Sequence, residues 1–298
     1  MFVKNYEHLM QLAKEKESIT IAVAAAEDLG ELQVVEEATK QNLAKFVLVG
    51  DEAKIKQIIK ENKMEIDSPI VATNSLEESA AKAVELVRSG DAQTVMKGML
   101  HTRIIMRAVL NKEKGLNVGK PVTAASMMEK IDGDGFLLMT DPAIAIAPDL
   151  NTKKGMIENA VSIARGLGVE KPNVACVCAQ ELVNPAMADT LDAAILSKMA
   201  DRGQIANCVV DGPLAFDNAY LESAAKAKGI NSPVAGKTDI MMFSDIDVAN
   251  SVVKTVRYIG GYELITATVG TKVPIILSSR AGTLRPRLLT VALTAYLI

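Results

Sequence analysis

A serine and an arginine near the end of the chain occupy a position where α/β proteins present ligand-binding groups. Ser279 and Arg280 lie at the end of an apolar run that predicts a strand over 273–278, and a turn of small residues and a helix follow them. Ligands of α/β folds bind beyond the carboxyl ends of the strands. The serine hydroxyl can donate one hydrogen bond, and the guanidinium can contact a phosphate or a carboxylate at two points. The alternative is a helix-capping serine beside a solvated arginine.

A second strand-to-helix junction carries several cations. Lys97 follows a predicted strand, a glycine makes the turn, and Thr102 is the expected N-cap of a helix over 102–111. Arg103 and Arg107 are one turn apart and therefore share a helix face. Cations beside a helix N-terminus form a site for a polyanion. Ordinary solvated surface charge is the alternative interpretation.

Two other groups of reactive side chains have simpler interpretations. Asp211 and Asp217 could bind Mg²⁺ or act as bases, but an Asp-Gly-Pro turn followed by a helix cap is favoured. Cys176 and Cys178 share one face of a predicted strand, no histidine is near them in the sequence, and their spacing is not that of a zinc site. They predict packing, so we expect no metal centre.

The triplet Gly236-Lys237-Thr238 matches the end of a nucleotide-binding P-loop, G-x-x-x-x-G-K-[ST]. A P-loop must leave a strand and open a helix, so that backbone N–H groups point at the phosphates. Here a helix-like segment precedes the triplet, and the apolar run 239–243 predicts a strand after it. We therefore expect a loop that leads into a strand, without nucleotide binding.

The elements that must position these residues alternate along the chain. Short apolar runs are followed by longer segments with helical spacing, which predicts β-α-β units, parallel sheets and helices on both faces. About ten strands are too many for one small sheet, so we predict two α/β domains with a cleft between them. The predicted strands are 19–26, 45–49, 70–72, 93–96, 136–140, 173–178, 208–210, 239–243 and 273–278. The predicted helices are 29–42, 52–62, 75–89, 102–111, 152–167, 187–202, 221–228, 247–258 and 284–297.

The composition excludes several classes of protein. The net charge of −3, the absence of tryptophan and the 3% aromatic content argue against a nucleic-acid surface. No apolar run is long enough for a membrane span, and the charged, amphipathic N-terminal segment does not resemble a signal peptide. The 3 cysteines without a secretory signature predict a reducing, cytoplasmic environment.

Several stretches together resemble the phosphate acetyl/butyryl transferase family, and the resemblance covers nearly the whole chain, from about residue 19. Two of them, N-P-A-M at 184–187 and the stretch over 196–205, look closer to the butyryl branch. The others are M-K-G at 96–98, M-R-A-V-L-N-K-E at 106–113, T-D-P-A-I-A-I-A-P-D at 140–149, V-V-D-G-P-L-A-F-D-N at 209–218, S-P-V-A-G at 232–236 and S-D-I-D-V-A-N at 244–250, with Lys254.

This resemblance implies a reversible reaction in which butanoyl-CoA and phosphate give butanoyl phosphate and free coenzyme A. It also implies two α/β domains like those of isocitrate and isopropylmalate dehydrogenases, with the active site in the interdomain cleft. We place the first domain at 1–139 plus 277–298 and the second at 140–276. The resemblance implies a homo-oligomer, no metal and no permanently bound cofactor, since coenzyme A is a substrate.

The family's catalytic residues can be carried over only where the sequence matches. The family's Ser-Arg pair falls on Ser279 and Arg280, and its phosphate-contacting helix arginine falls on Arg107. Four further residues are candidates for substrate binding in the cleft. They are Lys97, Thr102, Asn250 and Lys254.

The chain departs from the family just after the Ser-Arg pair. Acetyl-transferring relatives carry an acidic residue there that is proposed as the base, and butyryl relatives usually carry aspartate at the position of Gly282. This chain has no acid from Ala281 to Arg287 and is instead basic there. The alternatives are therefore a phosphate acetyltransferase or another acyl specificity, a decarboxylating dehydrogenase of related fold, and a non-catalytic acyl-CoA-binding protein.

Overall fold

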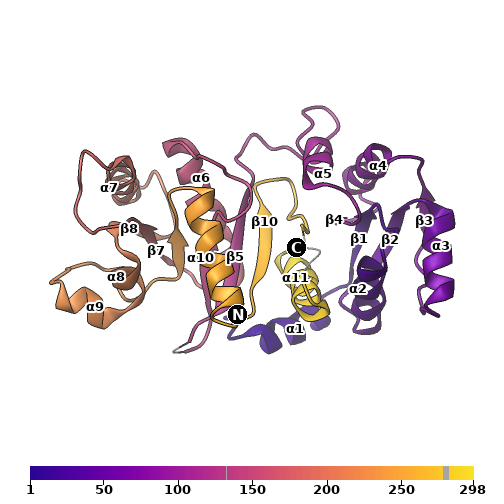
Figure 1. Ribbon diagram of the computed structural model, residues 1–298, viewed down its shortest axis with the longest axis horizontal. Helices are drawn as coiled ribbons and strands as arrows, with labels where there is room; N and C mark the ends of the chain where they lie inside the picture. Colours follow the sequence, from indigo (N-terminus) through magenta and orange to yellow (C-terminus); the bar gives the residue numbers. More distant parts are fainter. Residues whose placement is uncertain (132, 278–281) are drawn as a thin grey trace. The chain divides into compact units, whose positions relative to one another are not determined.

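The computed structural model describes residues 1–131, 133–277 and 282–298 (Figure 1). The chain forms two compact units: unit 1 comprises Met1–Asn5 and Pro121–Leu264, and unit 2 comprises Tyr6–Lys120 and Ile265–Ile298. The chain passes between the units after Asn5, after Lys120 and after Leu264. Antiparallel pairing of two strands within 123–140 keeps that segment in one unit. The predicted α/β class with mostly parallel sheets is confirmed.

Unit 2 is built on a four-stranded parallel sheet with the order β3-β2-β1-β4. Alternate residues of β1 enter different cores: Ile21 and Val23 pack in one cluster, and Ala22 and Ala24 pack in the other. This alternation is the period of two expected for a strand with both faces covered by helices. The strands of this sheet are β1 (Ile19–Ala24), β2 (Ala44–Gly50), β3 (Ile70–Ala72) and β4 (Thr94–Lys97), and unit 2 also contains the strand β10 (Ile265–Val269), which is not part of it. The helices are α1 (Tyr6–Glu15), α2 (Leu29–Lys40), α3 (Glu52–Glu61), α4 (Leu76–Ser89), α5 (Thr102–Val109) and α11 (Leu284–Leu297).

The predicted strand 273–278 is reduced to single bridges. Ile276 forms a parallel bridge with Met96 of β4, and Ile275 forms an antiparallel bridge with Thr268 of β10. The sequence prediction also missed β10 itself, which ends just before the 271–274 turn. The segment that leads toward Ser279 therefore runs beside the carboxyl end of β4.

Unit 1 contains a mixed sheet in which β5, β6, β9, β7 and β8 lie side by side in that order. β5 pairs antiparallel with β6, and the other pairs are parallel. Its strands are β5 (Thr123–Glu129), β6 (Phe136–Thr140), β7 (Asn173–Val177), β8 (Val209–Leu214) and β9 (Ile240–Met242). Its helices are α6 (Leu150–Gly166), α7 (Ala188–Asp201), α8 (Phe216–Tyr220), α9 (Glu222–Ala227) and α10 (Ile246–Tyr258).

The P-loop-like triplet lies in a loop before β9, as the sequence predicted. Ser232 Oγ accepts hydrogen bonds from the N–H groups of Val234 and Ala235, and Thr238 Oγ1 donates to the carbonyl of Ala219. No helix begins at the triplet. The hydroxyl and the glycine therefore shape a turn. In the part of the chain that is described, no helix is both long and apolar enough to cross a membrane.

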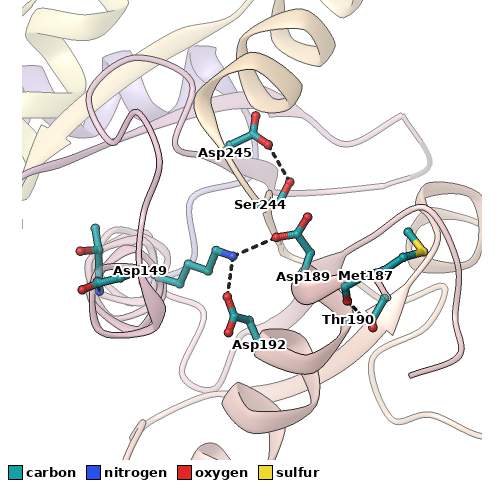
Figure 2. A network of polar contacts seen from close by, with 9 residues as sticks. Asp149, Met187, Asp189, Thr190, Asp192, Ser244 and Asp245 are labelled. Atoms are coloured by element: carbon teal, nitrogen blue, oxygen red, sulfur yellow. Dashed lines mark hydrogen bonds and ion pairs between the residues drawn. The ribbon is translucent and has the colours of Figure 1, made fainter. Parts of the chain in front are cut away.

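A buried lysine joins α6 to α7 in unit 1 (Figure 2). Lys153 Nζ donates to Asp189 Oδ1 at 3.1 Å and to Asp192 Oδ2 at 2.7 Å, and the lysine side chain is 5% exposed. Burial alone would lower the pKa of Lys153, but the hydrogen bonds to Asp192 and Asp189 outweigh it and raise the pKa. The ion pairs of Lys153 with Asp189 and Asp192 therefore stabilise unit 1 at neutral pH.

A second buried ion pair joins α2 to α11 in unit 2. Arg287 Nη2 lies 2.5 Å from Glu31 Oε1, and both side chains are almost fully buried. Gly30 leaves room for the guanidinium, because a Cβ there would lie only 3.0 Å from Arg287 Nη1. Burial raises the pKa of the Glu31 carboxyl, and the charges of Arg287 and Lys97 act against that rise. Arg287 therefore belongs to the core of unit 2.

We predict that Asp192→Ala destabilises the protein by about 2 kcal/mol, below the roughly 3–5 kcal/mol for breaking a fully buried pair, because Asp189 stays with the lysine. Since the pKa of Lys153 is raised, the pair's contribution is complete below pH 10.5 and is lost as the pH rises through the higher folded value. Urea unfolding at pH 7 measures the difference. Asp201 is an exposed aspartate on the same helix and serves as the control. If Asp192→Ala lowered the free energy of unfolding no more than Asp201→Ala does, the prediction would be contradicted.

We predict that Glu31→Gln destabilises the protein by about 3 kcal/mol, because it leaves the Arg287 charge buried without its carboxylate. The double variant Glu31→Gln/Arg287→Met is expected to be more stable than Glu31→Gln alone, since the uncompensated charge is gone. Chemical unfolding of the wild type, both single variants and the double variant gives the coupling. Additive effects of the two substitutions would show that the pair does not act as a unit.

Candidate functional site

The junction between β4 and α5 is held tightly against the end of β1. The N–H of Gly98 donates to the carbonyl of Ala24 at 2.9 Å, and the N–H of Met99 donates to the carbonyl of Ala25 at 2.7 Å. A Cβ at Gly98 would overlap the carbonyl oxygen of Ala25, so only glycine allows this approach. The turn that follows Lys97 is therefore fixed by the sheet itself.

Lys97 is the last residue of β4 and is 6% exposed. Its ammonium donates to the carbonyl oxygens of Gly98 and Leu100, each at 3.3 Å. The backbone N–H of Lys97 donates to the carbonyl of Ile276 at 2.9 Å. A buried cation thus lies at the carboxyl end of β4, beside the segment that leads to residue 277.

The N-terminus of α5 differs from those of the other helices that follow strands of this sheet. α2, α3 and α4 begin with a side chain that accepts a hydrogen bond from the first turn: Asp28, Asp51 and Ser75. α5 begins at Thr102 with His101 as its N-cap, and the histidine makes no such hydrogen bond. The prediction of Thr102 as the N-cap is therefore wrong: it is the first helical residue. Unlike the other three, this helix begins without a side-chain cap, a geometry that suits an anion.

Arg107 lies on the exposed side of α5. Its side chain is 71% exposed, and the closest carboxylate oxygen, Glu77 Oε1 of α4, is 4.0 Å from Nη2. At that distance and exposure the ion pair contributes little. The guanidinium is thus accessible to an anionic ligand, in the same unit as Lys97 and Thr102.

Ser279 and Arg280, the pair on which the sequence prediction rests most heavily, lie outside the described residues. The basic stretch that follows is described from Gly282 onward and is largely neutralised. Arg285 Nη2 contacts Glu7 Oε1 at 2.7 Å, and Arg287 is paired with Glu31. The two arginines are therefore committed to contacts within unit 2.

Asn250 and Lys254 lie on α10 in unit 1. Asn250 Nδ2 donates to the carbonyl of Pro142 at 2.8 Å, whereas Lys254 is exposed. The loop that Asn250 holds follows β6 and is also fixed by buried Asp141. That carboxylate accepts hydrogen bonds from the backbone N–H groups of Ala124, Ala143, Ile144 and Ala145. Asn250 thus supports a loop at the carboxyl edge of the sheet in unit 1.

The remaining sequence candidates have structural roles. Asp211 Oδ1 accepts a hydrogen bond from the N–H of the next residue, Gly212, at 2.8 Å. The prediction of an Asp-Gly-Pro turn is wrong, because residues 211–213 continue the strand β8. Asp217 is not the predicted cap either: it lies in the first turn of α8, whose N-cap is Ala215. Burial raises the pKa of the Cys178 thiol to about 11 and that of Cys208 to about 11, so both stay protonated near neutral pH. Within the described ranges, no three His, Cys, Asp or Glu side chains gather where they could hold a metal ion.

Sequence reasoning missed the buried acid Glu31, although a signal was present. Glu31 lies three and four residues before Val34 and Val35, so it occupies the apolar face of α2. A carboxylate on such a face needs a buried partner, which here is Arg287. The fixed loop around Asp141 gave no comparable signal, because an aspartate before proline is common in ordinary turns.

The chain matches the family model described as phosphate acetyl/butaryl transferase over residues 68–295. It is 42% identical over 294 residues to the phosphate butyryltransferase of Clostridium acetobutylicum, covering 98% of both chains. It is 41% identical to the phosphate acetyltransferase of Thermotoga maritima, covering 97% of this chain and 98% of the relative. The two relatives are almost equally similar to it.

Solved structures agree with this assignment. A branched-chain phosphotransacylase from Enterococcus faecalis V583 has a TM-score of 0.81 and 28% sequence identity, covering 94% of this chain and 98% of the other. A putative 4-hydroxythreonine-4-phosphate dehydrogenase from Salmonella typhimurium shares the fold at a TM-score of 0.57 and 12% identity, covering 95% of this chain and 100% of the other. With the family model spanning most of the chain, the conclusion is direct: this protein belongs to the phosphate acetyl/butyryl transferase family, whose members are acyltransferases.

Proposed function

We propose that the protein transfers a butanoyl group between coenzyme A and inorganic phosphate. The observation that supports this proposal most is the β4–α5 segment of a family member: buried Lys97 ends β4, α5 begins without a side-chain cap, and exposed Arg107 lies in the last turn of that short helix. Positive charge together with a helix N-terminus that no side chain caps suits a phosphoryl oxygen. Coenzyme A enters as a substrate.

In the direction that consumes butanoyl phosphate, the thiol of coenzyme A must lose its proton, because the thiolate is the nucleophile. A free thiol has a pKa of about 8.5, so a cationic site can supply enough thiolate without a strong base. This chain has no acid from Gly282 to Arg287. We therefore assign the activation of the thiol to positive charge.

The thiolate attacks the acyl carbonyl in a ternary complex, and the C–O bond to phosphate breaks as the tetrahedral intermediate collapses. We assign Ser279 to a hydrogen bond with the oxyanion or the thiol. Arg280 and Arg107 hold the phosphate, whose charge grows as it leaves. Binding both substrates together supplies the proximity contribution without a covalent acyl-enzyme. Lys97, Thr102 and Lys254 are proposed to bind substrate, and Asn250 is proposed to act through the loop that it holds.

The first test measures free thiol released from butanoyl-CoA, with and without phosphate, beside the same assay with acetyl-CoA. We expect phosphate-dependent release that is faster with butanoyl-CoA. Equal or faster release from acetyl-CoA would overturn the chain-length assignment and keep the reaction, as the Thermotoga relative makes reasonable. No release from either, with coenzyme A still bound, would overturn the reaction and favour an acyl-CoA-binding protein.

A second test removes the two arginines one at a time. Arg280→Ala and Arg107→Gln are each expected to lower turnover about 10²–10³-fold, because each removes a preorganised donor to the leaving phosphate. Arg88→Gln, on the exposed face of α4, is the matched control and should leave turnover unchanged. A loss below threefold in Arg280→Ala or in Arg107→Gln would reject the role assigned to that residue.

A further inference from the structure

Three buried charged side chains of unit 2 interact near the carboxyl end of β1: Lys97, Glu31 and Arg287. Lys97 lies opposite Ala24 in the register of β4 with β1, and the N–H groups of the two residues after it donate to the carbonyls of Ala24 and Ala25. Helix α2 follows the same strand end, and Glu31 is in its first turn. Burial raises the pKa of the Glu31 carboxyl, and the charges of Arg287 and Lys97 act against that rise, so Lys97 and Glu31 interact through space.

The Glu31 carboxylate is held by Arg287. Its Oε1 lies 2.5 Å from Arg287 Nη2, and its Oε2 is buried without a hydrogen-bond partner among the described residues. The N–H of Glu31 donates to Asp28 Oδ1 at 3.0 Å, which fixes the backbone that carries the carboxylate. A guanidinium does not lose its proton in a protein, so the positive charge of Arg287 is permanent. The negative charge of Glu31 is therefore compensated within unit 2 before any substrate binds.

The balance of these charges affects how strongly Lys97 attracts an anion. Glu31 and Arg287 cancel, so the three side chains sum to one positive charge at the carboxyl ends of β1 and β4. Without Arg287, the carboxylate of Glu31 would offset the charge of Lys97 instead. Buried charges are screened less than exposed ones, so a change of one charge here acts strongly on a bound anion.

We propose that Arg287 is a positioning residue for phosphate binding: by pairing with Glu31, it keeps the charge of Lys97 available to the substrate phosphate. The inference rests on the proposed function, in which Lys97 binds substrate. It also gives Arg287, in the basic stretch after position 282, a role in phosphate affinity without contact with the phosphate.

The test titrates the full-length protein with inorganic phosphate by calorimetry at pH 8, so the readout does not depend on turnover. Arg287→Met should weaken phosphate binding about tenfold, because the Glu31 carboxylate then offsets Lys97. Glu31→Gln should tighten phosphate binding about threefold or more, because a negative charge is removed, although this variant is expected to be less stable. Structural damage alone would weaken binding in both variants, so the opposite signs separate the two explanations.

Further variants connect the effect to charge. The double variant Glu31→Gln/Arg287→Met should bind phosphate within about threefold of the wild type, because the sum of the charges is restored. Arg287→Lys keeps the charge and should also retain the affinity, which tests the inference again if Arg287→Met folds poorly. Lys45→Gln removes an exposed positive charge near the amino end of β2 and should leave phosphate binding unchanged.

Unchanged or tighter phosphate binding in Arg287→Met, weaker binding in Glu31→Gln, or no saturable binding by the wild type would overturn the inference. Thiol release from butanoyl-CoA, measured on the same proteins, keeps this failure distinct from failure of the proposed function. Phosphate binding that follows the expected order of variants, without thiol release by the wild type, would support the role of Arg287 and reject acyl transfer. Phosphate-dependent thiol release together with equal phosphate affinity in Arg287→Met and the wild type would do the reverse.

Discussion

The close approach of the β4–α5 turn to the end of β1 is the constraint on which unit 2 depends. β1 is the central strand that pairs with both β2 and β4, and it ends in alanines that keep the space above it small. Gly98 can therefore lie directly against the carbonyl of Ala25. This approach sets where Lys97 ends its strand and where α5 begins, so the cationic junction inherits its geometry from the packing of the sheet.

Ion pairs compensate the charges of several basic side chains in both units. A chain with basic residues after position 282 risks placing uncompensated charge beside its own cationic site. Glu31 and Glu7 take up Arg287 and Arg285, respectively, within unit 2. In unit 1, Lys153 forms ion pairs with two aspartates of α7. The buried side chains of Arg287 and Lys153 are thus each paired with carboxylates of their own unit, whereas the side chain of Arg107 is 71% exposed and accessible to a ligand.

The sequence predicted most of the α/β alternation and the cationic character of the β4–α5 junction. Apolar runs, helical spacing of apolar residues and a glycine turn are all visible in short stretches of sequence. It missed β5, whose T-A-A-S-M-M-E run has few β-branched residues and is stabilised by pairing with β6. It misplaced the cap of α5, since the backbone geometry at His101 follows from the turn held against β1. Glu31 could have been found from its place on the apolar face of α2.

The loop after β6 has a consequence for how the family can diverge. Its shape is fixed by backbone N–H groups bonded to Asp141 and by the carbonyl of Pro142 bonded to Asn250. The side chains of Ile144 and Ile146 take no part in these bonds, and Ile146 is 74% exposed. Substitution of exposed Ile146, proline excepted, is therefore expected to leave the conformation of the loop unchanged. In such a loop, exposed side chains can change during evolution while the backbone conformation stays the same.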